Sequence, residues 1–126
     1  MTLSLLLKIN AWAMAAAGIV LFASPGGIPA TVGIHIERDA YLVCYLLGAA
    51  EFAFATLCWL SSRSRQAQTL RIAAVACVVL HAASGLGELL ALFQGVAAAL
   101  WLNVGLRILM IALFYYYAWR RPPGVA

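Results

Sequence analysis

Four long apolar segments dominate the sequence and constrain its fold more than any other feature. They cover residues 3–24, 40–60, 70–93 and 96–119. Each is close to the ~20 residues that a helix needs to cross a hydrocarbon core of ~30 Å. Lipid cannot satisfy backbone polar groups, so such segments form helices unless they alternate in polarity like barrel strands, which these do not. The sequence therefore predicts one all-α domain over residues 1–126, an integral membrane four-helix bundle.

Composition excludes the soluble classes of protein. Of the 126 residues, 66% are hydrophobic and 10% are charged, and the mean hydropathy is +0.99. A soluble domain is about a quarter charged, so a cytosolic enzyme, a disordered chain and a secreted disulfide scaffold are all excluded. The first segment resembles a signal peptide, but residues 21–23 lack the pair of small residues of a cleavage site. We expect it to be retained as the first span.

The basic residues predict the orientation of the bundle, because short cytoplasmic loops carry an excess of Lys and Arg. Most of them fall near the N-terminus, in the loop between the second and third spans, or near the C-terminus: Lys8, Arg63, Arg65, Arg71, Arg120 and Arg121. Only Arg38 falls in a loop on the opposite side. We therefore expect both termini in the cytoplasm and the loop 25–39 outside. The net charge of +4 follows from this topology and indicates no nucleic-acid partner.

Four ionisable residues lie inside the apolar segments, namely Glu51, His81, Glu88 and Arg107. A charged side chain at a helix centre costs about 2.5 to 3.5 kcal/mol on translocon scales, so these residues should face one another or a wet cavity. With a rise of ~1.5 Å per residue, Glu51, His81 and Arg107 each lie roughly 17–18 Å inside a span. Glu88 lies nearer the exterior. The sequence predicts that Glu51 and Arg107 pair at the bilayer middle with His81 beside them.

Helical spacing places these residues on three narrow lines of small or polar groups. The lines are Cys77, His81, Ser84 and Glu88 on the third span; Cys44, Gly48, Glu51, Ala55 and Cys58 on the second; and Asn103, Arg107, Met110 and Phe114 on the fourth. We expect the three lines to meet inside the bundle, and small residues such as Gly18 and Gly85 let membrane helices approach closely.

The interior cluster has a structural and a functional interpretation. In the first, the polar residues only neutralise one another and fix helix register. In the second, they form a ligand-binding or proton-sensitive site, as intramembrane ionisable residues commonly do. The members of this candidate site are Glu51, His81, Ser84, Glu88, Asn103 and Arg107, with His35, Glu37 and Asp39 as an acidic entrance from the exterior. No catalytic residue and no metal site is expected.

The three cysteines, Cys44, Cys58 and Cys77, all lie inside predicted spans. A thiol–disulfide relay needs a close pair, usually C-x-x-C, and no two of these cysteines have that spacing. We expect them to act as small packing residues.

Short apolar motifs throughout the chain resemble the DoxX-like group of small four-span bacterial proteins. The motifs are residues 7–11, 45–50, Trp59-Leu60 followed by Arg63, Leu70-Arg71, residues 80–82, and Gly95-Val96 with Trp101. The resemblance implies a four-helix bundle in the bacterial inner membrane, with an indirect association with redox or quinone-linked systems. His81 is the one polar position that it carries over. Glu51 and Glu88 fall where that group has apolar residues, so the interior of this chain is specialised.

Three classes of function remain open. The first is binding of a small apolar or amphipathic molecule, or service as an accessory subunit of a membrane assembly. The second is a proton-coupled transporter acting as an oligomer, although the first span lacks the carboxylate that small multidrug transporters carry there. The third is a haem- or quinone-binding redox subunit, although His81 has no second histidine at its depth for axial ligation of haem. A Glu and a His could serve as acid and base, but no nucleophile motif or phosphate loop accompanies them, so an enzyme is unsupported.

The predicted orientation is testable by cysteine accessibility. The test uses a cysteine-free background and intact cells. The thiol introduced by Ser64→Cys, in the loop of Arg63 and Arg65, should react only with a membrane-permeant reagent. Thr31→Cys in the opposite loop should also react with an impermeant reagent. Labelling of Ser64→Cys by the impermeant reagent in intact cells would reverse the orientation.

Overall fold

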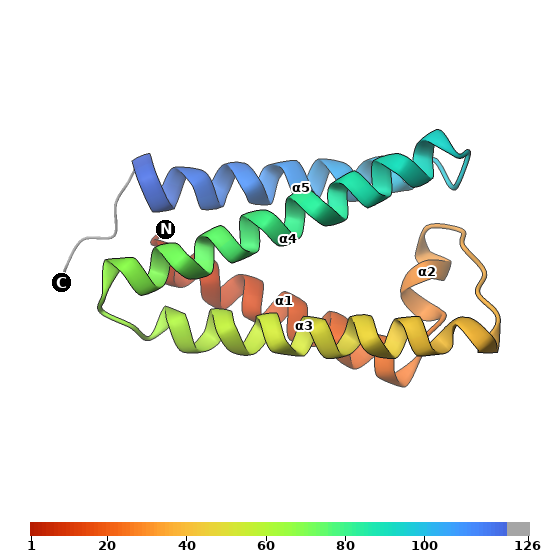
Figure 1. The fold of residues 1–126 in the computed structure, drawn as a ribbon, viewed down its shortest axis with the longest axis horizontal. Helices are drawn as coiled ribbons and strands as arrows, with labels where there is room; N and C mark the ends of the chain where they lie inside the picture. Colours follow the sequence, from red (N-terminus) through yellow and green to blue (C-terminus); the bar gives the residue numbers. More distant parts are fainter. Residues whose placement is uncertain (121–126) are drawn as a thin grey trace.

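The computed structural model describes residues 1–120, and its long apolar segments are all helical (Figure 1). The long helices are α1 (Leu3–Ala23), α3 (Tyr41–Ser62), α4 (Ala67–Phe93) and α5 (Leu100–Tyr115), which continues into a π-helical turn (Tyr116–Arg120). A short helix α2 (Gly27–Thr31) and a 3-10 turn (Arg38–Ala40) lie between α1 and α3. Within the described residues, four helices are long and apolar enough to cross a membrane, counting α5 with its π-helical turn as one. The predicted all-α fold is confirmed.

Local signals set the ends of the helices. The Thr2 side chain accepts a hydrogen bond from the Leu5 backbone N–H and caps α1, which ends at Ala23 because Pro25 disfavours helix at Ser24. The fourth span is predicted to begin at residue 96, but α5 begins at Leu100. The reason is a Schellman turn: Gly95 has φ +80°, and the Val96 N–H bonds to the Ala91 carbonyl at 3.0 Å.

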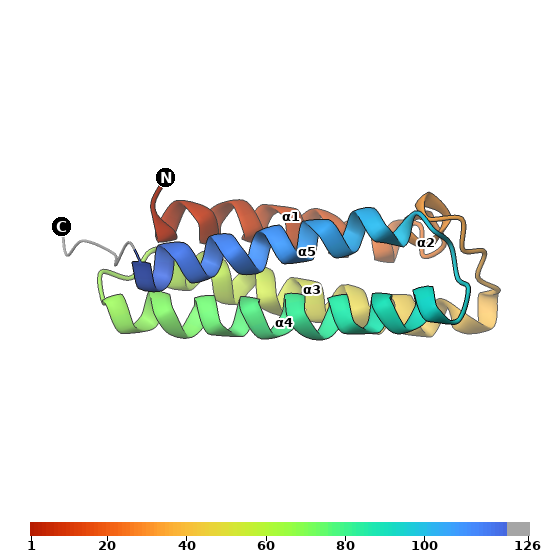
Figure 2. The ribbon, with the colours of Figure 1, turned by 90° about the horizontal axis from the view of Figure 1, so that it is seen from above.

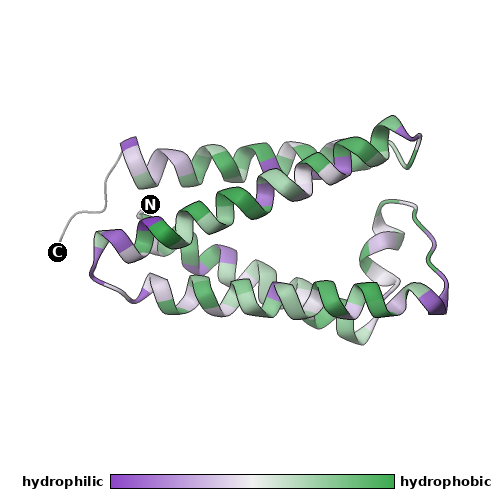
Figure 3. Cartoon of the chain, in the orientation of Figure 1, coloured by the Kyte–Doolittle hydropathy of each residue, from purple (hydrophilic) through white to green (hydrophobic). Residues whose placement is uncertain are grey.

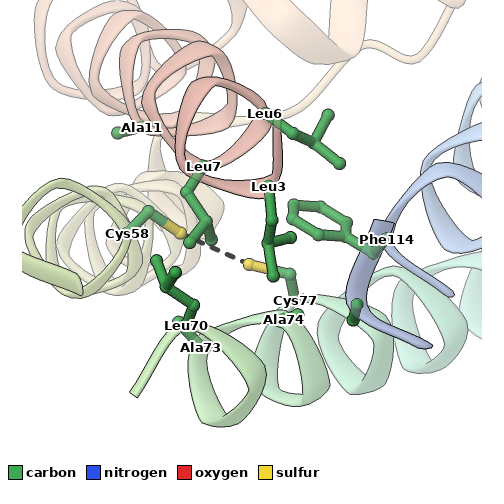
Figure 4. Close-up of a cluster of buried hydrophobic side chains, with 11 residues drawn as sticks. Leu3, Leu6, Leu7, Ala11, Cys58, Leu70, Ala73, Ala74, Cys77 and Phe114 are labelled. Atoms are coloured by element: carbon green, nitrogen blue, oxygen red, sulfur yellow. Dashed lines mark hydrogen bonds between the residues drawn. The ribbon is translucent and has the colours of Figure 1, made fainter. Parts of the chain in front are cut away.

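The four long helices form two pairs. Helix α1 packs along α3 and α4 packs along α5, with far fewer contacts between the pairs (Figures 1 and 2). The pairs lie close together at the end that carries the N-terminus and the α3–α4 loop, and they diverge toward α2. A continuous apolar core fills the close end (Figure 4): Leu3, Leu6, Leu7, Ala11, Cys58, Leu70, Ala73, Ala74, Cys77, Phe114 and Ala118.

Hydropathy follows the pattern of a membrane protein, with hydrophilic residues gathered mainly at the helix ends and loops (Figure 3). Large apolar side chains on the outer faces are exposed, including Leu46, Ile72 and Leu102 at 60% or more. Contiguous apolar surface of this extent is typical of a protein that contacts lipid or a partner. The N-terminus, the α3–α4 loop and the end of the π-helical turn at Arg120 lie at one end of the bundle (Figure 1). Arg121 lies outside the described residues, and the side of the membrane that this end faces stays a prediction.

Helices α1 and α3 approach each other closely at two glycines. A Cβ added to Gly18 would lie 3.0 Å from Phe52 Cε1 and 3.2 Å from the Gly48 carbonyl oxygen. One added to Gly48 would lie 2.9 Å from the Phe22 ring. These distances are shorter than ordinary Cβ contacts, so a larger residue at either position would force the neighbouring atoms to shift.

We predict that Gly18→Leu destabilises the bundle, because α1 must move away from α3 to accommodate the side chain. Overpacking of this kind typically costs about 1–3 kcal/mol, which thermal unfolding in mild detergent would measure. Gly87→Leu is the matched control, since a Cβ at Gly87 meets no atom within 4 Å. Equal melting temperatures for the two variants would contradict the close approach.

Candidate ligand-binding site

Arg107 is the centre of the polar cluster. It lies on α5, and its side chain reaches two residues of α4 that are two turns apart on one face. Its Nη2 and Nε donate to Glu88 Oε1 at 3.1 and 3.3 Å, and its Nη1 donates to His81 Nδ1 at 3.4 Å. Within residues 1–120, Arg107–Glu88 is the one ion pair shorter than 4 Å. Arg107 therefore holds Glu88 with one side of its guanidinium group and His81 with the other.

The predicted pairing of Arg107 with Glu51 is wrong, and the start of α5 explains why. Counted from Leu100, Arg107 is seven residues, or about 10 Å, into its helix. Glu88 is five residues, or about 7.5 Å, from the end of α4 at Phe93, so it is close to the level of Arg107. Glu51 also lies in the other helix pair, since α3 packs mainly on α1. It is half-buried, and no hydrogen bond or ion pair within the described chain engages it.

The contact with Arg107 fixes the tautomer of His81. A guanidinium group can only donate, so Nδ1 must accept and the ring hydrogen must be on Nε2. His81 is 7% exposed, and its ring stacks on Phe114 with the ring centroids 6.2 Å apart. His81 Nε2 is buried and has no hydrogen-bond partner within residues 1–120, and the same holds for Glu88 Oε2. The cluster thus retains one unused buried donor and one unused buried acceptor, which is costly in an apolar interior.

A cavity of about 230 Å³ adjoins this cluster. Its lining has a polar part, formed by His81, Asn103 and Arg107, and an apolar part, formed by Leu106 and Met110. Gly85 lies beneath Arg107, where an added Cβ would be 3.6 Å from Arg107 Cβ, so a small residue lets α5 lie close to α4. The cavity can therefore receive a molecule with a polar head and an apolar body.

The remaining predicted site residues are only partly brought together. Asn103 lines the cavity one turn before Arg107. Ser84 is half-buried on α4 between His81 and Glu88. The expected entrance residues His35, Glu37 and Asp39 are exposed, and no described hydrogen bond or ion pair connects them to the cluster.

Sequence reasoning missed a second buried cluster in the core at the other end of the bundle. The Sγ atoms of Cys58 and Cys77 lie 3.3 Å apart, although the spacing of the cysteines indicated no close pair. The side-chain Nδ2 of Asn10, which carries two hydrogens, lies within hydrogen-bonding distance of both cysteines and of Met14. The only signal in the sequence is Asn10 itself, a polar residue within an apolar span. Spacing along one helix cannot reveal a contact among three helices.

Comparison of the chain with protein-family models, curated proteins and solved structures found no match.

We predict strong coupling between Glu88 and Arg107 in a double-mutant cycle. Either Glu88→Leu or Arg107→Leu leaves a charge without its partner, which costs about 3 kcal/mol for a largely buried pair. The double variant leaves no orphan charge and should recover much of that loss in detergent unfolding. Glu51→Leu combined with Arg107→Leu is the matched cycle, and it should be close to additive. Additivity for Glu88 with Arg107, together with strong coupling for Glu51 with Arg107, would show that the partner of Arg107 is Glu51 on α3.

Proposed function

We propose that this protein is a multi-pass membrane protein that binds a small amphipathic molecule between its helices, with the polar head at Arg107 and His81. The observation that carries the proposal is the buried Nε2–H of His81, which has no hydrogen-bond partner among residues 1–120, in a residue that also lines a cavity with a polar and an apolar part. A buried donor of this kind gains its missing hydrogen bond when a ligand supplies an acceptor.

The charges of the site define the class of ligand. Glu88 already balances Arg107, so a neutral head with a carbonyl or hydroxyl oxygen fits better than an ion. Arg107 makes three of its five possible donations, which leaves two N–H groups for the same head. Ligand pockets usually enclose 300–1,000 Å³, so a cavity of about 230 Å³ holds the head and leaves part of the apolar body among the helices. A quinone belongs to this class, as does a long-chain alcohol.

The location and the family are also proposals. The exposed apolar faces and the basic end of the bundle support a membrane protein whose termini are cytoplasmic. The resemblance to the DoxX-like group supports a place in the bacterial inner membrane, either as a homo-oligomer or as an accessory subunit of a larger assembly. Haem is a poorer fit than a neutral amphipath, because His35 is exposed in the loop before α3 and offers His81 no histidine partner.

One observation favours a second candidate, a proton-coupled transporter acting as an oligomer. Arg107 is engaged by Glu88, so it does not neutralise Glu51 by direct pairing. An intramembrane carboxylate without a partner is typical of proton-coupled sites.

Organic extraction of protein purified in mild detergent tests the binding proposal. Mass spectrometry should find one neutral amphipathic compound in stoichiometric amount with the wild-type chain. His81→Phe removes the Nε2–H but keeps a ring against Phe114, so it should lower retention at least tenfold, whereas Glu51→Gln should retain the compound.

Equal retention by wild type and His81→Phe, or extracts with only bulk lipid, would contradict the proposal. The transport candidate would replace it if a pH gradient then drove uptake of tetraphenylphosphonium into proteoliposomes and Glu51→Gln abolished that uptake.

A further inference from the structure

Three sulfur atoms from three helices gather around one amide in the core at the basic end of the bundle. Asn10 Nδ2 lies 3.2 Å from Met14 Sδ, 3.5 Å from Cys58 Sγ and 3.6 Å from Cys77 Sγ. Asn10 and Met14 belong to α1, Cys58 to α3 and Cys77 to α4. Figure 4 shows the two cysteines facing each other across the interface between the helix pairs.

This cluster is separate from the candidate ligand-binding site and is fully enclosed. Cys58 and Cys77 are 0% exposed, Asn10 is 3% exposed and Met14 is 5% exposed. All three cysteines of the chain are free thiols, so the sulfur atoms of the pair are available as ligands. An enclosed site that presents one thioether and two thiols offers only soft donors.

We propose that Met14, Cys58 and Cys77 form a binding site for a soft monovalent metal ion, copper(I). Thiolate and thioether ligands together select copper(I), whereas zinc in structural sites takes four ligands and calcium takes oxygen atoms. Counting only His, Cys, Asp and Glu side chains, no group of three within residues 1–120 is placed to hold a metal. A group of three candidate ligands is found only when the methionine sulfur is counted as a ligand as well.

The charge balance also favours a monovalent ion. The residues in contact here carry no formal charge: one amide, one thioether and two thiols. When copper(I) binds, one thiol loses its proton to solvent and a sulfur–copper bond replaces the sulfur–hydrogen bond, with no change of oxidation state. The product of one cation and one thiolate is neutral, which avoids the cost of a net charge in the interior.

Asn10 has a distinct role in this arrangement. Hydrogen bonds to an ionised acceptor are roughly twice as strong as those between neutral groups, so its N–H groups stabilise thiolate over thiol. Metal–thiolate bonds are about 2.3 Å long in zinc sites. A metal ion that took the place of Asn10 Nδ2 would therefore draw each sulfur inward by about 1 Å. The amide would turn aside and donate its hydrogen bonds to the sulfur atoms that hold the metal. The unbranched methionine side chain permits such a shift.

A reversible Cys58–Cys77 disulfide is the competing interpretation. A disulfide would join the two cysteine sulfurs, and neither Met14 nor Asn10 would take part in the bond. The two interpretations differ in the role of Met14, which makes that residue the discriminating position.

The test uses the full chain in detergent under anaerobic, reducing conditions, with copper(I) or redox-inert silver(I) supplied against a competing chelator. We expect one ion per chain. Met14→Leu, which keeps the volume and both thiols, should weaken copper(I) binding at least tenfold, and Cys58→Ser should do the same. Cys44→Ser is the matched control, because it removes a thiol outside the cluster, and it should bind like wild type.

Size-exclusion profiles and circular dichroism would establish that each variant is folded. Failure of the folded wild-type chain to retain copper(I) or silver(I) would overturn the proposal, as would unchanged binding in Met14→Leu. Isolation of a Cys58–Cys77 disulfide whose reduced form binds neither ion would favour the competing interpretation.

Discussion

Arg107 imposes the strongest physical constraint on the half of the bundle near α2. A guanidinium group does not lose its proton in a protein, so within an apolar segment it must find acceptors. It finds them on α4, in Glu88 and in the Nδ1 atom of His81. These contacts stabilise the packing of α5 on α4. Within residues 1–120 the Nε2 atom of His81 has no hydrogen-bond partner, and His81 lines the adjoining cavity together with Asn103 and Arg107.

The two halves of the bundle have different chemistry. At the basic end, the helix pairs share a continuous apolar core, with Cys58 and Cys77 in contact inside it. Toward α2 the pairs diverge (Figure 1), and in this half Arg107 of α5 contacts Glu88 and His81 of α4. The loop before α3 bends back over this end, since a Cβ on Gly33 would lie 4.0 Å from Ala97 Cβ in the α4–α5 turn. The basic half thus holds the two pairs together through its shared core.

The sequence predicts the helices well and their contacts less well. Apolar run length identifies the spans because it reports directly on the thickness of the bilayer, and helical spacing correctly groups His81 with Glu88 and Asn103 with Arg107. The partner of Arg107 was not predictable from depth alone, because Gly95 ends α4 in a left-handed turn and delays α5 by four residues. The contact of Cys58 with Cys77 depends on how α3 faces α4, and spacing within one helix contains no information about that.

The central claim is that Arg107 orients His81 so that its Nε2–H is free to bind a ligand. Nitrogen-15 NMR of the histidine rings in lipid nanodiscs tests this directly, with a His35→Gln variant leaving His81 as the only signal. The account predicts a neutral ring protonated on Nε2 at neutral pH, and loss of this fixed tautomer in Arg107→Leu. A ring protonated on Nδ1, or on both nitrogens, would contradict it, because neither form can accept a hydrogen bond from the guanidinium group.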